Sequence, residues 1–241
     1  MSVVARFCFA RKGPVCYIGH LDMLRYFQKA VMRSGIPAKY SEGFHPHQLM
    51  SFAYPLGVAM ETEGDYMDLE LTEELPEEEL KERMNAVMKE GVSIRKVTLL
   101  KEGAPNAMSL VALADYRLET DVEETELKRA VSELLAETEL LVGAEARPSK
   151  DGRKKKEKKP KDIRPGILEL RAEGEGCLFM KLLSGSAMNV RPADVFSLLC
   201  EKLGREAELL RLVRLEIYGA EDSAYKPLSE MGAAASTAAE A

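Results

Sequence analysis

This sequence of 241 residues lacks several features that would indicate its location or function. No apolar run approaches the roughly 18 residues that a helix needs to cross a bilayer, so no contact with a membrane is expected. The N-terminal stretch contains Arg6 and no small-residue cleavage site, which argues against a signal peptide. The four cysteines are widely spaced and include no CxxC pair, which predicts reduced thiols and a cytoplasmic location.

Motifs that hold phosphates, metals or clusters are also missing. The sequence has no glycine-rich phosphate loop and no nucleophile elbow. It lacks the CxxxCxxC motif that holds the cluster of radical S-adenosylmethionine (radical SAM) enzymes. The only histidines are His20, His45 and His47. A zinc site needs three or four ligands in fixed geometry, and if this segment is extended, His45 and His47 point to opposite faces and do not easily bind one ion. No metal is expected, and no cofactor either.

What is present is an ordinary globular composition with one strongly basic segment. Hydrophobic residues make up 46% and charged residues 31%, which excludes wholesale disorder. The net charge is −6, yet residues 147–164 contain ten Lys or Arg against three Asp or Glu. Such a segment attracts polyphosphate by releasing condensed counterions, and the alternative is a solvated hairpin tip that aids solubility. The predicted nucleic-acid contacts are Lys150, Arg153, Lys154, Lys155, Lys156, Lys158, Lys159, Lys161 and Arg164.

The periodicity of apolar residues predicts an α+β fold built from two tandem ferredoxin-like modules, with antiparallel sheets and helices on one face. In the first module we expect strands at 3–10, 36–41, 66–71 and 92–100, and helices at 20–34 and 76–90. In the second we expect strands at 113–120, 140–147, 163–172, 177–183 and 209–218, and helices at 123–137 and 192–203. The predicted domains are module 1–100, linker 101–112, module 113–219 with the basic hairpin 147–164, and a disordered tail 220–241.

The segment 40–57 is predicted to be a ligand or partner loop, because it concentrates imidazole, aromatic and glycine residues. His20 and Asp22 open the helix that precedes it. His20 is the one candidate catalytic base; the alternative is that Asp22 caps free N–H groups while His20 packs under the loop. The candidate loop-site residues are His20, Asp22, Tyr40, Ser41, Gly43, Phe44, Pro46, His47, Ser51 and Phe52.

A string of short motifs in the first 70 residues resembles a radical-SAM-associated family known as DUF2344. The motifs are Arg6-Phe7, Gly19-His20-Leu21-Asp22, the segment YSEGFHPH at 40–47, Ser51-Phe52, Pro55-Leu56-Gly57 and Tyr66-Met67-Asp68. The sequence departs from the family at His45 and Gln48, where members often carry Asn and Pro, so His45 is given no catalytic role. Members occur as separate chains or as C-terminal domains of B12-binding-type radical SAM proteins. The resemblance implies a soluble accessory or substrate-binding module that works with a radical SAM enzyme.

Three functions follow from these observations. The first is a non-catalytic binding module that holds RNA through the basic hairpin while a separate radical SAM chain does the chemistry. The second is a metal-independent endoribonuclease that uses His20, because tandem ferredoxin-like modules are similar to the CRISPR-repeat endoribonucleases. The third is a scaffold that binds only proteins, with the basic segment serving solubility.

Overall fold

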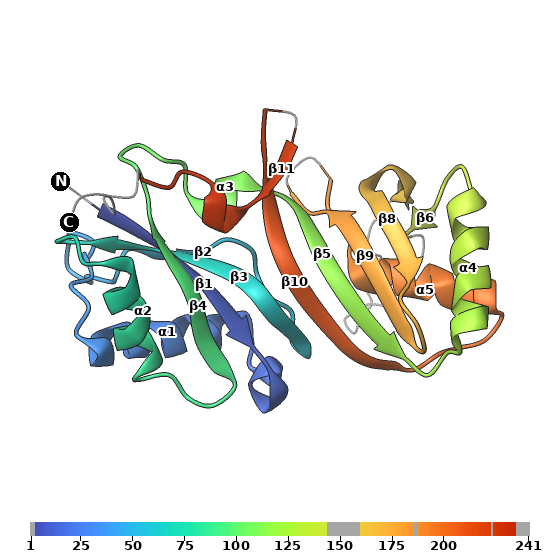
Figure 1. Cartoon of the computed structure of the whole chain (residues 1–241), viewed down its shortest axis with the longest axis horizontal. Helices are drawn as coiled ribbons and strands as arrows, with labels where there is room; N and C mark the ends of the chain where they lie inside the picture. Colours follow the sequence, from blue (N-terminus) through green and yellow to red (C-terminus); the bar gives the residue numbers. More distant parts are fainter. Residues whose placement is uncertain (1–2, 144–159, 186–187, 223, 235–241) are drawn as a thin grey trace, which may run out of the picture. The chain divides into compact units, whose positions relative to one another are not determined.

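The structure, a computed structural model, describes residues 3–143, 160–185, 188–222 and 224–234. The chain forms two compact units, which are Met1–Ala114 with Arg211–Ala241, and Asp115–Leu210. It passes between them within the strands β5 (Val111–Thr120) and β10 (Leu209–Glu221) (Figure 1). The described residues contain five α-helices and mostly antiparallel strands, so the predicted α+β class is confirmed. In these ranges no helix is long and apolar enough to cross a membrane.

The first unit consists mainly of an antiparallel sheet with two helices packed against it. Its further elements are β1 (Val3–Arg11), α1 (His20–Ser34), β2 (Met50–Phe52), β3 (Met60–Leu71), α2 (Glu77–Asn85), β4 (Val92–Leu99), α3 (Ala107–Leu110) and β11 (Ala224–Pro227). The strand order is β4-β1-β3-β10, with β2 paired to β3 and β11 paired to β10. All of these pairs for which the register is defined are antiparallel except β3 with β10.

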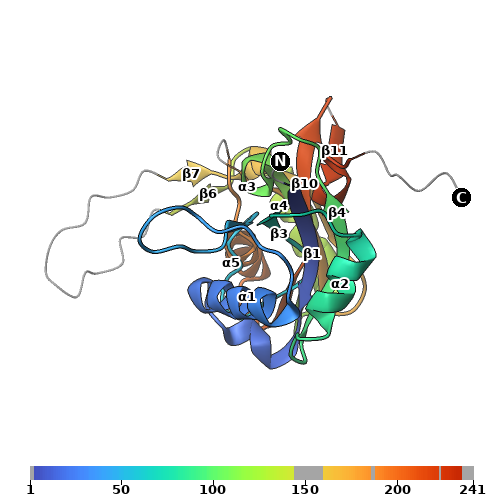
Figure 2. The ribbon, with the colours of Figure 1, turned by 90° about the vertical axis from the view of Figure 1, so that its left-hand side faces the viewer.

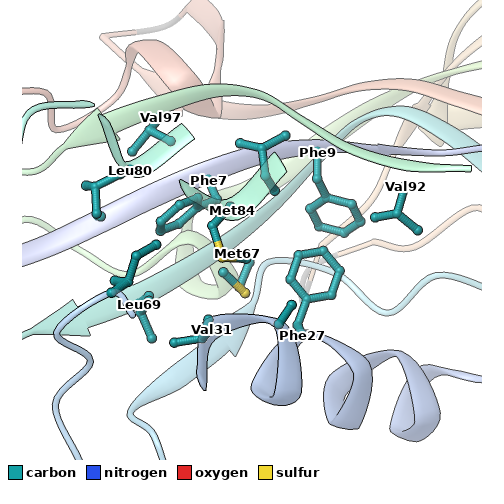
Figure 3. Packing of buried hydrophobic residues seen from close by; sticks show 14 of the residues in the cluster. Phe7, Phe9, Phe27, Val31, Met67, Leu69, Leu80, Met84, Val92 and Val97 are labelled. Carbon is teal, nitrogen blue, oxygen red and sulfur yellow. The ribbon is translucent and has the colours of Figure 1, made fainter. Parts of the chain in front are cut away.

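Side chains on β1 alternate between the two faces of this sheet, as a strand requires. Phe7 and Phe9 lie on the face that packs against α1 and α2, where Phe27 and Val31 of α1 reach toward them (Figure 3). The phenyl rings of Phe9 and Phe27 are 4.9 Å apart. Burial of this apolar face is the main force that holds α1 on the sheet.

Helix α1 occupies the predicted range 20–34. The helix buries Met23, Phe27 and Val31, which are spaced four residues apart and share one side of the helix. It ends at Gly35, whose φ of 66° is left-handed and therefore favours glycine. Figure 2 shows α1 and α2 beside β1, with the blue loop between α1 and β2 extending away from the helix.

The second unit also combines strands with two helices. Its further elements are α4 (Glu124–Ala136), β6 (Leu141–Val142), β7 (Lys161–Asp162), β8 (Ile167–Ala172), β9 (Cys177–Leu183) and α5 (Pro192–Leu203). The strand order is β5-β9-β8, while β6 and β7 pair with each other in a separate two-stranded sheet. Helix α4 contacts both α5 and β8.

Two expectations for strands in the first unit were wrong. Residues 36–41 were predicted to form a strand, but the structure has only the isolated bridges of Ala38 with Leu71 and of Tyr40 with Gln48. Pro37 has no N–H to give to a ladder, which weakens this segment as a strand. The strand that pairs with β3 is instead β2, which lies in the segment predicted to be a loop.

The segment after residue 219 differs from the predicted disordered tail. Strand β11 pairs with β10, and a 3-10 helix follows at Leu228–Glu230. Leu228 and Met231 are buried in a cluster with Cys8 and Tyr66, on the sheet face opposite α1. Tyr66 of β3 is fully buried beneath this segment. The apolar groups of the segment gain free energy by covering the strand.

Candidate functional site

The loop at 41–47 presents an aromatic side chain to solvent. Phe44 is fully exposed at the tip of the loop, and the neighbouring His45 and Pro46 are exposed as well. Gly43 has a φ of 110°, which only glycine adopts without strain, so the backbone turns sharply just before the tip. A fully exposed phenyl ring keeps its apolar surface in water, and such a ring is typical of contact surfaces when it is part of a patch.

Hydrogen bonds close the base of this loop. The Ser41 N–H donates to the His47 carbonyl at 2.8 Å, and the His47 N–H donates to Ser41 Oγ at 3.1 Å. Ser41 Oγ also lies 2.8 Å from His47 Nδ1. Next to the loop, the buried Gln48 donates through Nε2 to the Gln28 carbonyl of α1 at 3.2 Å and to the half-exposed Tyr40 hydroxyl at 3.3 Å. The loop is therefore a closed structure held at its base against α1.

His20 takes no part in this loop. Its half-buried ring packs edge to face on Phe52, with ring centroids 5.6 Å apart, and it makes no hydrogen bond to a described residue. Phe52 in turn packs on Phe9 and Phe27. The structure thus brings His20 and Phe52 together but ties His47 to Ser41, so the predicted ten-residue site divides into separate parts.

His20 instead lines a small cavity inside the first unit. The cavity has a volume of about 10 Å³, which is room for roughly one water-sized oxygen. Its walls are mostly aromatic and aliphatic, with two charged side chains among them. The lining residues are Phe9, Arg11, His20, Met23, Phe52, Tyr54, Leu56 and Asp65.

Arg11 is completely buried beside this cavity. Its Nη1 donates to the Ile18 carbonyl at 3.0 Å, and its Nη2 donates to the carbonyls of Gly57 and Met60 at 2.8 and 2.7 Å. Its Nε has no hydrogen-bond partner among the described residues. Burial lowers the pKa of Arg11, and the nearby Asp65 carboxylate opposes this shift. The guanidinium therefore holds two chain segments, at Ile18 and at 57–60, while the Nε–H has no acceptor among the described residues.

Asp65, which also lines the cavity, forms a buried charged pair with Arg214. Arg214 Nη2 lies 3.6 Å from Asp65 Oδ2 and donates to the Pro55 carbonyl at 3.2 Å, while its guanidinium carbon lies 4.7 Å from the centre of the Tyr54 ring. Asp65 Oδ1 accepts from the Tyr66 N–H at 3.3 Å. Within the described ranges, Asp65 Oδ2 and the Nε and Nη1 of Arg214 have no hydrogen-bond partner. Burial raises the pKa of Asp65 to about 6, although Arg214 and Arg11 counteract the rise.

An irregularity in the sheet places Asp65 at this position. In the ladder of β1 with β3, Phe9 is opposite Asp65 and Arg11 is opposite Thr62, so β3 contains one extra residue between the two pairs. Gly64 lies in this bulge, and a Cβ there would come within 2.6 Å of the Leu215 carbonyl oxygen. Bulges of this kind re-aim side chains and are frequent beside functional sites.

Sequence reasoning missed Arg11, Tyr54, Asp65 and Arg214 as site residues. A usable signal was present, because Arg11 ends an apolar strand and Arg214 interrupts the strand-like segment 209–218. A charged side chain inside a strand that is otherwise apolar must be paired or functional.

Two of the predicted loop-site residues lie apart from both the loop and the cavity. Asp22 is exposed and pairs with Arg25 one helical turn later, at 2.8 Å. Ser51 on β2 lines a larger groove of about 280 Å³ together with the buried Asp68. Within the ranges that the structure describes, no group of three or more His, Cys, Asp or Glu side chains could hold a metal ion.

The basic segment is described only at its ends. Lys150, Arg153, Lys154, Lys155, Lys156, Lys158 and Lys159 lie outside the described residues. Lys161 Nζ donates to the Asn189 carbonyl at 3.0 Å, and Arg164 Nη2 donates to the Leu135 carbonyl at 3.2 Å. Pairing of β6 with β7 brings residues 142 and 161 together, so the segment between them begins and ends at one place in the second unit.

Comparison with known proteins agrees with the motifs of the first 70 residues. Residues 5–192 match the model of a family described as uncharacterized protein conserved in bacteria (DUF2344). The match extends over most of the chain and confirms the resemblance. No curated protein matches the chain.

Proposed function

We propose that this chain, which belongs to the DUF2344 family, is an accessory binding module that acts in the cytoplasm with a radical SAM enzyme and binds RNA. The resemblance supports the enzyme partner, which supplies the radical chemistry on a separate chain. The four cysteines are free thiols and include no cluster motif, so this chain contributes binding and not the iron–sulfur cluster.

The fold behind this proposal is a pair of ferredoxin-like modules in tandem. The first unit supports it, because its chain order β1-α1-β2-β3-α2-β4 and its strand order β4-β1-β3-β2 are those of a ferredoxin-like module. The chain order β5-α4-β8-β9-α5-β10 repeats the same alternation. Open sheets of this kind leave loops free to carry binding residues.

The observation that carries the proposed function is the exposed ring of Phe44 on a loop with a closed base. Sequence-tolerant RNA binding uses aromatic rings on which bases stack, together with cations that contact the phosphates. Phe44 offers the ring, and the basic segment offers the cations. A hydrogen-bonded base reduces the entropy that the loop loses when it binds.

Labelled single-stranded RNA in EDTA tests the contribution of the basic segment. Replacing Lys154, Lys155, Lys156, Lys158 and Lys159 by Ser should weaken binding and flatten its salt dependence by about one unit of slope for each phosphate that the variant no longer binds. The matched control replaces five exposed lysines elsewhere, Lys29, Lys89, Lys96, Lys101 and Lys128, and removes the same charge. Equal reductions of affinity in both variants, or none in either, would contradict a specific role for the segment.

A second substitution tests the loop. Phe44→Ser should reduce RNA affinity by about tenfold, which corresponds to removing one base-stacking interaction of roughly 1.4 kcal/mol. The control is Met32→Ser, because Met32 is also an exposed apolar residue of the first unit but lies on α1. If Phe44→Ser binds RNA as tightly as the wild type but no longer captures a radical SAM enzyme, the loop contacts the protein partner and not the RNA.

The same RNA assay tests whether the chain is an endoribonuclease. His20 lies beside a buried carboxyl group, Asp65, in one cavity, and this observation favours acid–base chemistry there. If the wild-type chain cleaves RNA in EDTA and His20→Ala does not, the chain is an enzyme and the binding-module proposal is replaced. If RNA is bound and recovered intact, the binding module stands.

A further inference from the structure

We propose that the cavity beside His20 is the inner end of a second binding site, which takes the hydroxyl group of a small neutral molecule with an aromatic body. This site is separate from the loop at 41–47, and no property of the DUF2344 match assigns it. Its basis is the size of the cavity, two buried polar atoms of its lining residues that have no hydrogen-bond partner among the described residues, and the exposure of the lining side chains.

The size of the cavity limits what can enter it. A volume of about 10 Å³ holds one oxygen atom and excludes a carboxylate, a phosphate or a sugar ring. The inner end can therefore receive only the terminal atom of a ligand. The body of the ligand must remain outside the cavity.

The chemistry of the wall selects that atom. Arg11 Nε is an N–H donor without a partner among the described residues, and Asp65 Oδ2 is an acceptor without one. Both side chains are at least nine-tenths buried, and both line the cavity. A buried donor or acceptor that stays unpaired is costly. A hydroxyl oxygen satisfies both atoms at once, because it accepts from Arg11 and donates to Asp65.

Charged groups of similar size do not satisfy both atoms. An anionic oxygen accepts from Arg11 but has no proton to donate to Asp65, so it leaves Asp65 Oδ2 without a hydrogen bond. An ammonium group donates to Asp65 but cannot accept from Arg11, whose guanidinium repels it. Arg214 adds a further positive charge beside Asp65 and also opposes a cation. The wall therefore selects a neutral hydroxyl.

The two half-exposed side chains of the cavity lining are both aromatic. Of the eight lining residues, His20 and Tyr54 are half-exposed and the other six are buried. A ligand whose hydroxyl lies inside therefore has its body between the imidazole and the phenol ring. Flat rings pack well against such groups, so an aromatic body is favoured. The imidazole nitrogens make no hydrogen bond to a described residue and stay available to the ligand.

Nuclear magnetic resonance of the full chain with ¹³C-labelled methionine methyl groups tests this site in the wild type. Met23 lines the cavity, and Met32 on the same helix is exposed and serves as the internal control. Benzyl alcohol should shift the Met23 signal in a saturable way, with a Kd of about 1 mM, and leave Met32 in place. Benzoate and benzylamine, which carry a carboxylate and an ammonium on the same ring, should not shift Met23.

The outcomes of this titration are decisive. Equal shifts of Met23 with all three compounds would show an unselective apolar crevice and overturn the proposal. The absence of any saturable shift with benzyl alcohol would overturn it as well. Both results are obtained on the wild-type chain and do not depend on whether a variant folds.

A pair of variants then locates the hydroxyl. Asp65→Asn keeps the shape of the side chain but removes the charge of the acceptor, and should weaken benzyl alcohol binding by about tenfold. Asp22→Asn changes an exposed aspartate on α1 and should leave binding unchanged. Equal affinity in the wild type and Asp65→Asn would contradict the assignment. Phe44→Ser should retain the Met23 shift, so failure of the RNA proposal and failure of this one are distinguishable.

Discussion

Strand β3 carries a buried aspartate on each of its two faces, paired with Arg6 of β1 on one face and with Arg214 of β10 on the other, and the two pairs are satisfied differently. On the face covered by the C-terminal segment, Arg6 lies directly opposite Asp68. Arg6 Nε and Nη2 donate to the two Asp68 oxygens at 2.8 and 3.0 Å, which is a bidentate pair. Asp68 also accepts from the Ala107 N–H at 2.7 Å, and Arg6 Nη1 donates to the carbonyls of Leu228 and Met231.

On the α1 face, the buried charges remain partly unpaired. Asp65 is 3.6 Å from Arg214, and among the described residues neither Asp65 Oδ2 nor Arg11 Nε has a hydrogen-bond partner. The same two residue types, with the aspartate on β3 in both pairs, therefore have different roles. The complete network of Arg6 and Asp68 fastens segments distant in the sequence, while the incomplete one around Asp65 is typical of a site that receives a ligand.

The largest effect should come from breaking the complete pair. Asp68→Ala leaves the buried Arg6 guanidinium without its carboxylate and removes the acceptor of the Ala107 N–H. We expect the free energy of unfolding, measured in urea at pH 7, to fall by about 3–5 kcal/mol. The C-terminal segment should also become accessible to protease. A decrease of less than about 1 kcal/mol would show that this pair does not hold the segment.

An intermediate effect should come from the pH dependence of the incomplete pair. The pKa of Asp65 rises from 3.8 to about 6 in the folded chain, so the folded state binds this proton more tightly than the unfolded state does. The contribution of Asp65 to stability is therefore complete below pH 4 and is lost as the pH rises through 6. The total change is on the order of 2–3 kcal/mol.

The measurement compares the wild type with Asp65→Asn in urea at several pH values from 4 to about 7. Subtracting the two curves cancels the titration of other groups, which both chains share. The wild type should lose stability relative to the variant as the pH rises. A difference that is constant over this range, or that changes in the opposite direction, would show that burial does not dominate the environment of Asp65.

The smallest effect should come from an arginine–aspartate pair in water. Asp22 and Arg25 are exposed and lie one turn apart on α1. Asp22→Ala should change the free energy of unfolding by less than about 0.5 kcal/mol, and added salt should reduce even that change. A destabilisation comparable to that of Asp68→Ala would mean that burial is not what separates the three pairs.

Local sequence patterns determined much of the framework. The alternation in β1 and the helical period of α1 are properties of neighbouring residues, and the structure has a strand at Val3–Arg11 and a helix at His20–Ser34, close to the predicted ranges. The string of short motifs in the first 70 residues predicted the DUF2344 family, which the match over 5–192 confirms. The exposed tip of the loop also follows locally, because Gly43 permits the turn at Phe44.

Only the tertiary structure decided what the charges do. Arg6 and Asp68 are 62 residues apart, and Arg214 lies farther still from Asp65, so no local pattern could pair them. The burial of Leu228 and Met231 likewise depends on a sheet face formed by β1 and β3, which is why composition alone predicted a disordered tail. The spacing of residues along a strand determines which face each side chain occupies. Whether that face is buried depends on helices and strands that are distant in the sequence and pack against it.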